Sequence, residues 1–478
     1  MKSKPDRPRA KRSESAKPLQ PDYVARAREA ERDRTAVEHA EQKQLRRAVE
    51  AAIWGMPIVS FEAMRRGFFG LGAKYGDIVY LSKPGDWRLQ LTTPNASSLY
   101  VYFNFNTKNG PLVLEVPPAV GAGLFGSVLD AWQIPVGDIG PEGEDEGKGG
   151  KYLLLPPDFR EDAHAGYISL RFATYNGYAV FRAIPKTRSD EDTNKALDLV
   201  KQLRLYPHTA ESNPPEQRFI DAAGKAFEGI AAFDDTFYDG LATMVNEEPV
   251  ETRDLVAMDQ LQSVGIQKGK PFDPDESTRD VLQKAIDEAH ADFMSQVTCV
   301  EPYWPGARWG TPPFESAGAQ TGFTYQTDCL LNVDDRAANF FLACALPKRI
   351  GAASLYLLAA TDMNGAPFDG DNAYHLHVPA NVPAKQFWAV TVYDLASAAF
   401  IRESPKIEVN SYQELHTNAD GSVDVLFAPT APHGKESNWI ATAPAKNWFA
   451  AFRFYGPDQA IRDKTWRLPD IERMGSPT

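Results

Sequence analysis

The chain has 478 residues, of which 43% are hydrophobic and 24% charged, values typical of a globular protein with room for two or three domains. Its net charge of −13 argues against nucleic-acid partners and against an anionic membrane surface, and no run approaches the about 20 apolar residues of a membrane helix. Three cysteines without a C-x-x-C pair argue against a disulfide framework or a zinc knuckle, so we expect a cytoplasmic protein.

Residues 1–21 are basic and lack the apolar segment of a secretory signal, which predicts a disordered tail. Residues 22–54 contain no Gly or Pro and carry small apolar residues at helical intervals, which predicts one long helix ending at the Gly-Met-Pro of 55–57. Its apolar stripe is mostly alanine and buries little surface, so the helix must pack on the body or on the same helix of a second subunit. We favour the second arrangement, and expect a homo-oligomer.

Residues 55–188 predict an antiparallel β-sandwich domain, because short apolar and aromatic runs alternate with Gly, Pro and Asn. This segment includes G-x-G-x-x-G at 121–126, the spacing of a dinucleotide-binding turn. Two prolines precede it, and only eight residues separate Gly126 from Pro135, which is too short for the crossover helix of that fold. We therefore predict a loop between β-strands here and exclude a Rossmann oxidoreductase.

Residues 189–330 predict a helical linker region. Its clearest helix lies at 277–297, capped by Asp275 or Ser277. One face of that helix is apolar and consists of Val281, Leu282, Ala285, Ile286, Ala289, Phe293 and Val297. Residues 337–360 predict a further helix.

Residues 331–478 begin with that helix and then return to a period of two, which predicts a second antiparallel β-domain. The predicted fold class is therefore mainly β with a helical insert (α+β), built from two antiparallel β-sandwich or jelly-roll-like domains. The sequence contains no signature of a kinase, of a metalloprotease or of a serine α/β-hydrolase.

Motifs in both halves of the chain resemble a known pair of bacterial families. "DGDNAY" at 369–374, "QFWAVTVYD" at 386–394 and "NWIATAP" at 438–444 closely resemble domain of unknown function 1214. "TTPNASSLY" at 92–100 and "VLDAW" at 128–132 resemble its usual partner, domain of unknown function 1254, although residues 96 and 97 depart from that pattern. The resemblance implies two β-domains bridged by helices, and no agreed reaction. From these motifs we take the candidate substrate-binding residues Asn95, Tyr100, Asp130, Trp132 and Trp388.

Polar residues at strand ends of the last domain are the candidate catalytic groups. Tyr393 and Asp394 end one predicted strand, and Arg453 and Tyr455 share one face of another. Such groups at one end of a sandwich would bind a carboxylate or polarise a carbonyl, which favours a hydrolase or lyase acting on a small organic molecule. Two alternatives remain open: an Arg-Asp pair that only ties strands together, and a non-catalytic ligand-binding or oligomeric scaffold protein.

His375 and His377 form a candidate metal site, because alternate residues of a strand share a face about 7 Å apart. A divalent metal would need a third ligand from elsewhere in the chain. The alternative is a solvent-facing pair. No other cofactor is predicted.

Overall fold

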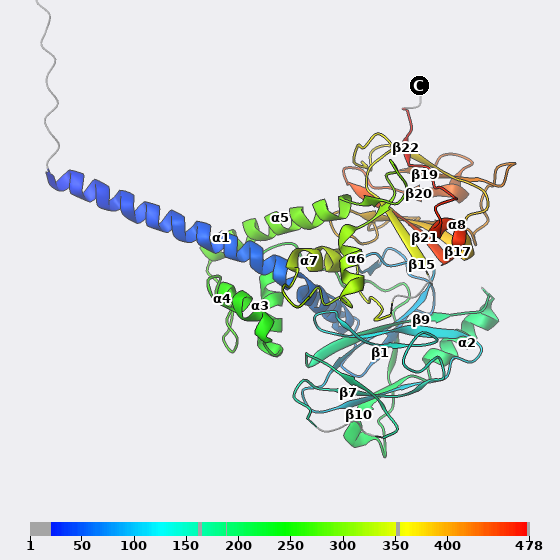
Figure 1. The fold of residues 1–478 in the computed structure, drawn as a ribbon, viewed down its shortest axis with the longest axis horizontal. Coiled ribbons are helices and arrows are strands. Elements are labelled where there is room, and N and C mark those ends of the chain that lie inside the picture. The colour runs from blue at the N-terminus through cyan, green and yellow to red at the C-terminus, as the bar shows by residue number, and fades with distance from the viewer. Residues whose placement is uncertain (1–20, 161–164, 188, 350–353, 476–478) are drawn as a thin grey trace, which may run out of the picture.

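A computed structural model describes residues 21–160, 165–187, 189–349 and 354–475. Residues 1–20, which hold nearly all of the predicted basic tail, lie outside this part of the chain. Figure 1 shows two β-rich domains side by side, with helices beside them and one long helix that projects outward. The predicted fold class, mainly β with a helical insert, is confirmed.

The first domain contains two packed sheets. Its strands are β1 (Ile78–Tyr80), β2 (Leu89–Gln90), β3 (Leu99–Asn106), β4 (Leu112–Val116), β5 (Gly123–Asp130), β6 (Pro135–Ile139), β7 (Gly150–Leu155), β8 (Ile168–Arg171), β9 (Asn176–Ile184), β10 (Arg204–Pro207), β11 (Phe219–Asp221) and β12 (Phe227–Glu228). The order is β11-β1-β3-β9-β5-β6 in the six-stranded sheet and β10-β4-β7-β8 in the four-stranded one, and β12 pairs with β2. Alternate apolar side chains of the two larger sheets, such as Phe103 and Leu114, share one core.

The predicted loop between β-strands is present at 117–122, but it ends earlier than expected: residues 123–126 of the G-x-G-x-x-G stretch begin β5, which pairs antiparallel with β6. Gly126 explains why glycine occurs here. A Cβ at this position would lie 2.1 Å from the carbonyl oxygen of Val180, so glycine lets β5 lie against β9. The antiparallel pairing leaves no crossover helix and no phosphate-binding turn.

The second domain repeats this arrangement. Its strands are β13 (Glu301–Pro302), β14 (Gly310–Thr311), β15 (Ser354–Ala359), β16 (Tyr374–Val378), β17 (Ala384–Asp394), β18 (Glu408–Asn410), β19 (Val423–Ala428), β20 (Trp439–Ala441), β21 (Trp448–Pro457) and β22 (Glu472–Arg473). The order is β13-β14-β15-β21-β17-β18 in the six-stranded sheet and β20-β19-β16-β22 in the four-stranded one. Apolar side chains of both sheets, among them Phe452 and Leu376, form a separate core.

The shorter helices are α2 (Asp190–Val200), α3 (Phe237–Glu247), α4 (Leu255–Gln262), α5 (Glu276–Thr298), α6 (Pro313–Gln320), α7 (Val333–Leu342) and α8 (Gln459–Arg462). The α5 prediction is confirmed: Asp275 caps the helix by accepting from the amide of Thr278, and all seven predicted apolar residues are buried. The predicted helix over 337–360 is wrong in its second half. Helix α7 ends at Leu342, ahead of Pro347, and residues 354–359 form β15 instead.

The long helix α1 (Pro21–Gly70) does not end at 55–57 as predicted. Gly55 lets α3 come close, because a Cβ there would lie 2.7 Å from Leu241 Cδ1. Pro57 continues the helix although it lacks an amide hydrogen, and its carbonyl accepts from Gln133 Nε2 at 2.8 Å. From Ala48 onward the helix packs against α3, α5 and α7, so tertiary contacts override the local stop signal.

Candidate functional site

The candidate site is built on one face of the six-stranded sheet of the second domain. Along β21, Phe452 and Phe454 point into the core, so Arg453 and Tyr455 point to the opposite face. Tyr356 of β15 lies directly across from Arg453 in the antiparallel register. Arg453 is nevertheless only 3% exposed, because this face is covered by the first domain.

A chain of hydrogen bonds connects Arg453 to the first domain. Arg453 Nη1 donates to Thr391 Oγ1 (2.8 Å), and Thr391 Oγ1 donates to Glu408 Oε2 (3.0 Å). The other oxygen of Glu408 accepts from Ser97 Oγ and from Asn410 Nδ2, both at 2.9 Å. Glu408 is thus a buried carboxylate whose orientation is fixed by donors from both domains.

The second arm of Arg453 reaches a strained turn of the first domain. Arg453 Nη2 donates to the carbonyl of Thr93 at 3.1 Å and to the Tyr393 hydroxyl, and that hydroxyl donates to the carbonyl of Pro94. Thr93 has a φ of 38°, a conformation that β-branched residues rarely adopt, and its hydroxyl donates to the carbonyl of Leu342 at 2.8 Å. Such strain is held only where the surroundings fix the backbone, which is typical of functional turns.

The surroundings of Arg453 keep it charged. Burial acts to lower its pKa, but the phenols of Tyr393 and Tyr455 and the carboxylate of Glu408 outweigh burial and raise the pKa above its ordinary value. For Tyr393 itself, burial is the larger effect and raises the pKa. The site therefore contains a permanent cation beside neutral phenols.

A cleft of about 400 Å³ lies between the two domains, and Ser97 and Glu408 are part of its wall. The cleft is also lined by Asp86, Trp87 and Leu99 of the first domain and by Ser404, Lys406, Asn410 and Gln413 of the second. The hydroxyl of Ser404 is buried and has no partner in the described part of the chain. The volume suits a small organic molecule.

Two of the predicted substrate-binding residues shape this cleft. Asn95 Oδ1 accepts from the amides of Ser97 (3.1 Å) and Ser98 (2.9 Å), which fixes the turn that presents Ser97. The Tyr100 hydroxyl accepts from the amide of Asn95 at 3.2 Å. Thr93 and Pro94, the two residues before Asn95, accept from Arg453 and Tyr393, so this turn of the first domain lies against the Arg453 cluster.

Trp388 and Asp394 lie outside this cluster. Trp388 points to the other face of the sheet and stacks on Phe452 in the core, with ring centroids 5.5 Å apart. Asp394 pairs with Lys446 at 2.5 Å and accepts from the amide of Ala396, so it does not meet Arg453. The predicted Arg-Asp pair is therefore not formed between Arg453 and Asp394, both of which lie in the described part of the chain.

Asp130 and Trp132 lie at a different place, where α1 meets α7. Trp132 contacts Trp54 edge to face at 4.9 Å, and the guanidinium carbon of Arg336 lies 5.1 Å from the Trp132 ring. Arg336 Nη2 donates to the carbonyl of Trp54, whereas its Nε and Nη1 have no partner within the described residues. Burial raises the pKa of Asp130 to about 7 and lowers that of Arg336 to about 10.

His375 and His377 share one carboxylate oxygen. Nε2 of His375 and Nδ1 of His377 each lie 2.9 Å from Asp424 Oδ1. Burial acts to raise the pKa of Asp424, but hydrogen bonds from Asn418 and from both histidines hold it well below its usual range. Among the described residues, no group of three or more His, Cys, Asp or Glu side chains has the arrangement of a metal site. A metal at these histidines stays a prediction.

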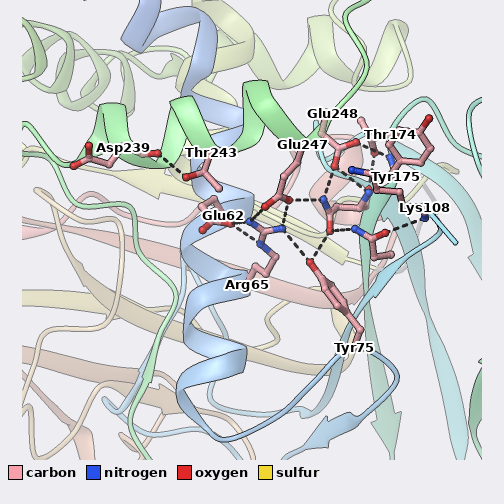
Figure 2. A network of polar contacts seen from close by, with 12 residues as sticks. Glu62, Arg65, Tyr75, Lys108, Thr174, Tyr175, Asp239, Thr243, Glu247 and Glu248 are labelled. Carbon is pink, nitrogen blue, oxygen red and sulfur yellow. Dashed lines mark hydrogen bonds and ion pairs between the residues drawn. The ribbon is translucent and has the colours of Figure 1, made fainter. Parts of the chain in front are cut away.

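A second buried polar cluster, shown in Figure 2, joins α1 and α3 to β9. Arg65 pairs with Glu62 and with Glu247, both at 2.5 Å. Asn176 Nδ2 donates to Glu247 at 2.8 Å and to Glu248 at 2.6 Å. Each of these side chains is engaged by its neighbours, so we assign the cluster a structural role.

The sequence reasoning did not identify Ser97, Glu408 or Arg182, all of which lie at the interdomain face. A signal was present for Glu408, because "EVN" at 408–410 puts one polar side chain on each side of a buried valine. Its position across from Thr391 depends on strand pairing, which the sequence pattern does not determine.

Comparisons with known proteins agree with this architecture. Residues 78–207 match the family model described as protein of unknown function DUF1254, and residues 353–459 match that of protein of unknown function DUF1214. No curated protein matches the chain. None of the described helices is long and apolar enough to cross a membrane.

Two solved structures are similar to the chain over most of its length. The VPA0106 protein from Vibrio parahaemolyticus is 17% identical with a TM-score of 0.51, and the match covers 90% of this chain and 100% of that one. An uncharacterised protein from Burkholderia cenocepacia is 15% identical with a TM-score of 0.40, covering 91% of this chain and 94% of that one. The first likeness shows a shared fold.

Proposed function

Since the chain carries a DUF1254 domain followed by a DUF1214 domain, neither with a known reaction, we propose a function from the site itself. The protein is an enzyme of the hydrolase or lyase type that acts on a small organic molecule in the interdomain cleft. One observation carries the proposal: the hydrogen-bonded chain from Arg453 through Thr391 and Glu408 ends at Ser97, in the cleft wall.

Ser97 and Glu408 are the groups that would reach a substrate. A carboxylate that accepts from a hydroxyl can take its proton as that oxygen attacks a carbonyl, or can remove a proton beside a carbonyl group. Thr391 and Arg453 act as positioning residues, because Thr391, itself held by Arg453, donates to Glu408 Oε2 and leaves Oε1 to Ser97 and Asn410. The apolar part of the cleft, including Leu99, supports binding of the substrate body.

The test is a turnover screen of the purified full chain on esters, amides and hydroxy acids, followed by variants. Glu408→Gln keeps the shape but removes the base, so kcat/KM for any substrate found should fall by about 100-fold or more. Glu414→Gln, at an exposed position four residues past Asn410, is the matched control and should keep full activity. Unchanged kcat/KM in a folded Glu408→Gln protein contradicts the assignment.

The alternative is a non-catalytic binding or scaffold protein, and a specific observation favours it as second candidate. The same hydrogen bonds also join the two domains, as does the exposed ion pair of Arg402 with Glu228. Under this alternative, Ser97→Ala and Glu408→Gln would lower the melting temperature while the screen finds no turnover. We keep the cytoplasm as the proposed compartment, consistent with three free cysteines in the described residues.

A further inference from the structure

A row of three side chains on the first domain faces the second. Tyr100, Arg182 and Phe125 lie directly across from one another on β3, β9 and β5. The guanidinium carbon of Arg182 is 5.5 Å from the Tyr100 ring and 6.0 Å from the Phe125 ring. Arg182 forms no ion pair with any acidic side chain in the part of the chain that the structure describes.

On the second domain, Tyr356, Tyr455 and the cation Arg453 face this row. Tyr356 lies across from Arg453, and its ring centroid is 6.3 Å from that of Tyr455. Both phenols act to raise the pKa of Arg182 and of Arg453. Arg453 also lacks an ion pair within the described residues, and its guanidinium carbon lies 5.2 Å from the Tyr356 ring. The hydroxyl of Tyr455 is buried and has no hydrogen-bond partner there. Arg453 is supported by Glu408 and by its hydrogen bonds, whereas Arg182 has no anionic partner in the described part of the chain and the Tyr455 hydroxyl is an unused donor.

The surroundings of this place are aromatic and partly open to solvent. Tyr455 stacks on Phe387 with ring centroids 4.1 Å apart, and Phe387 lies 4.6 Å from Tyr412. Tyr412, Tyr356 and Phe125 are 51%, 37% and 36% exposed. Large aromatic side chains that stay exposed together mark a binding surface more often than a bare outer face.

We propose that this face, formed by Phe125, Arg182, Tyr356, Phe387 and Tyr455, is a binding site for an aromatic carboxylate. The carboxylate lies on Arg182, whose planar guanidinium matches its two oxygens, and the Tyr455 hydroxyl supplies a further donor. The aromatic ring of the ligand packs against the exposed rings in offset or edge contact. None of these five side chains lines the interdomain cleft, so the site stands independently of the proposed catalysis.

Benzoate, benzamide and acetate, titrated calorimetrically into the full chain, test the proposal. Benzoate should saturate, benzamide should not bind because it lacks the charge, and acetate should bind at least about tenfold more weakly because it lacks the ring. Arg182→Met should weaken benzoate about tenfold or more without changing the melting temperature, and Tyr455→Phe should weaken it less. Arg349→Met, which removes an exposed guanidinium elsewhere, should bind like the original protein.

Three results would overturn the proposal. If benzoate and benzamide bind equally well, the site does not recognise a negative charge. If benzoate and acetate bind equally well, the site does not recognise an aromatic ring. If the Arg182→Met variant binds benzoate with unchanged affinity, benzoate binds at a site other than Arg182. Among the described residues, Glu408 accepts hydrogen bonds from Ala96, Ser97, Thr391 and Asn410 and from none of the five side chains of this face. Benzoate binding in the Arg182→Met variant and turnover in the Glu408→Gln variant therefore test the two proposals separately.

Discussion

Arg453 and Arg336 are both buried arginines, and their neighbours affect them in opposite ways. Phenols and the carboxylate of Glu408 surround Arg453 and raise its pKa, so its charge is well supported. At Arg336, burial dominates and lowers the pKa to about 10, and two of its nitrogens lack partners among the described residues. The nearby Asp130 supports that charge poorly, since burial raises its own pKa to about 7.

Asp130 predicts a pH dependence of stability. In the unfolded chain its carboxyl loses a proton near the ordinary value of 3.8, whereas the folded protein holds the proton up to about pH 7. Between these two values the unfolded state is favoured as pH rises, so the contribution of Asp130 to the free energy of unfolding is present below pH 4 and is lost by pH 7. Three pKa units correspond to a change of up to about 4 kcal/mol.

Urea unfolding of the original protein and of Asp130→Asn across pH 4.5–7.5 measures this contribution. The asparagine keeps an oxygen for the amide of Ile134, which lies 2.9 Å from Asp130 Oδ1, but it does not titrate. The difference between the two unfolding free energies should therefore change with pH in favour of the variant at neutral pH. A constant difference over this range would show that Asp130 ionises normally in the folded state.

At the scale of elements, the Figure 2 cluster fixes α1 to the rest of the first domain. Arg65 comes from α1, Glu247 from the end of α3 and Asn176 from the start of β9. Burial raises the pKa of Glu62 and of Glu248, so both carboxylates depend on these donors. Helix α1 therefore carries a charged anchor in addition to its apolar contacts.

Replacing Arg65 with Met should destabilise the protein by about 3–5 kcal/mol, because Glu62 loses its cation while it remains buried. Arg218→Met is the matched control. Arg218 also forms an ion pair, with Asp77 at 2.7 Å, but its side chain is 54% exposed, so we expect a loss of about 1 kcal/mol or less. Chemical unfolding of both variants measures the difference, and equal losses would contradict the buried-anchor argument.

The sequence pattern predicted elements where local and tertiary preferences agree. Helix α5 has a cap and a continuous apolar face, and both appear in the structure. The end of α1 was missed because α1 packs against α3, α5 and α7, and these tertiary contacts, which are not contained in the local pattern, continue the helix past the stop signal. Residues 354–359 were predicted helical because a short apolar run fits a buried strand equally well.

The candidate site was predictable only in part for the same reason. Arg453 and Tyr455 share a face because strand periodicity requires it, and that prediction needs no knowledge of strand partners. The proximity of Glu408 to Ser97 requires the second domain to dock on the first, across 311 positions of sequence. No local pattern contains that information.

At the scale of the whole molecule, α1 divides into a buried and a projecting part. Ala48, Ala51 and Ala52 are buried against the body, whereas the described side chains from Glu38 to Lys43 are exposed. Figure 1 shows the N-terminal part of the helix extending away from every other element. At 1.5 Å per residue, residues 21–43 span about 35 Å of helix.

Such a projecting helix needs a partner, because a helix gains most of its stability in water from tertiary packing rather than from propensity. We expect the partner to be the same helix of a second copy, since its charged and alanine-rich surface suits a narrow seam with a charged rim. Deleting residues 1–40 removes the projecting part and keeps the buried alanines. Light scattering should then show a lower mass per particle, with a circular dichroism spectrum and a melting temperature that indicate intact β-domains. An unchanged mass per particle would show that the projecting part of α1 does not hold subunits together.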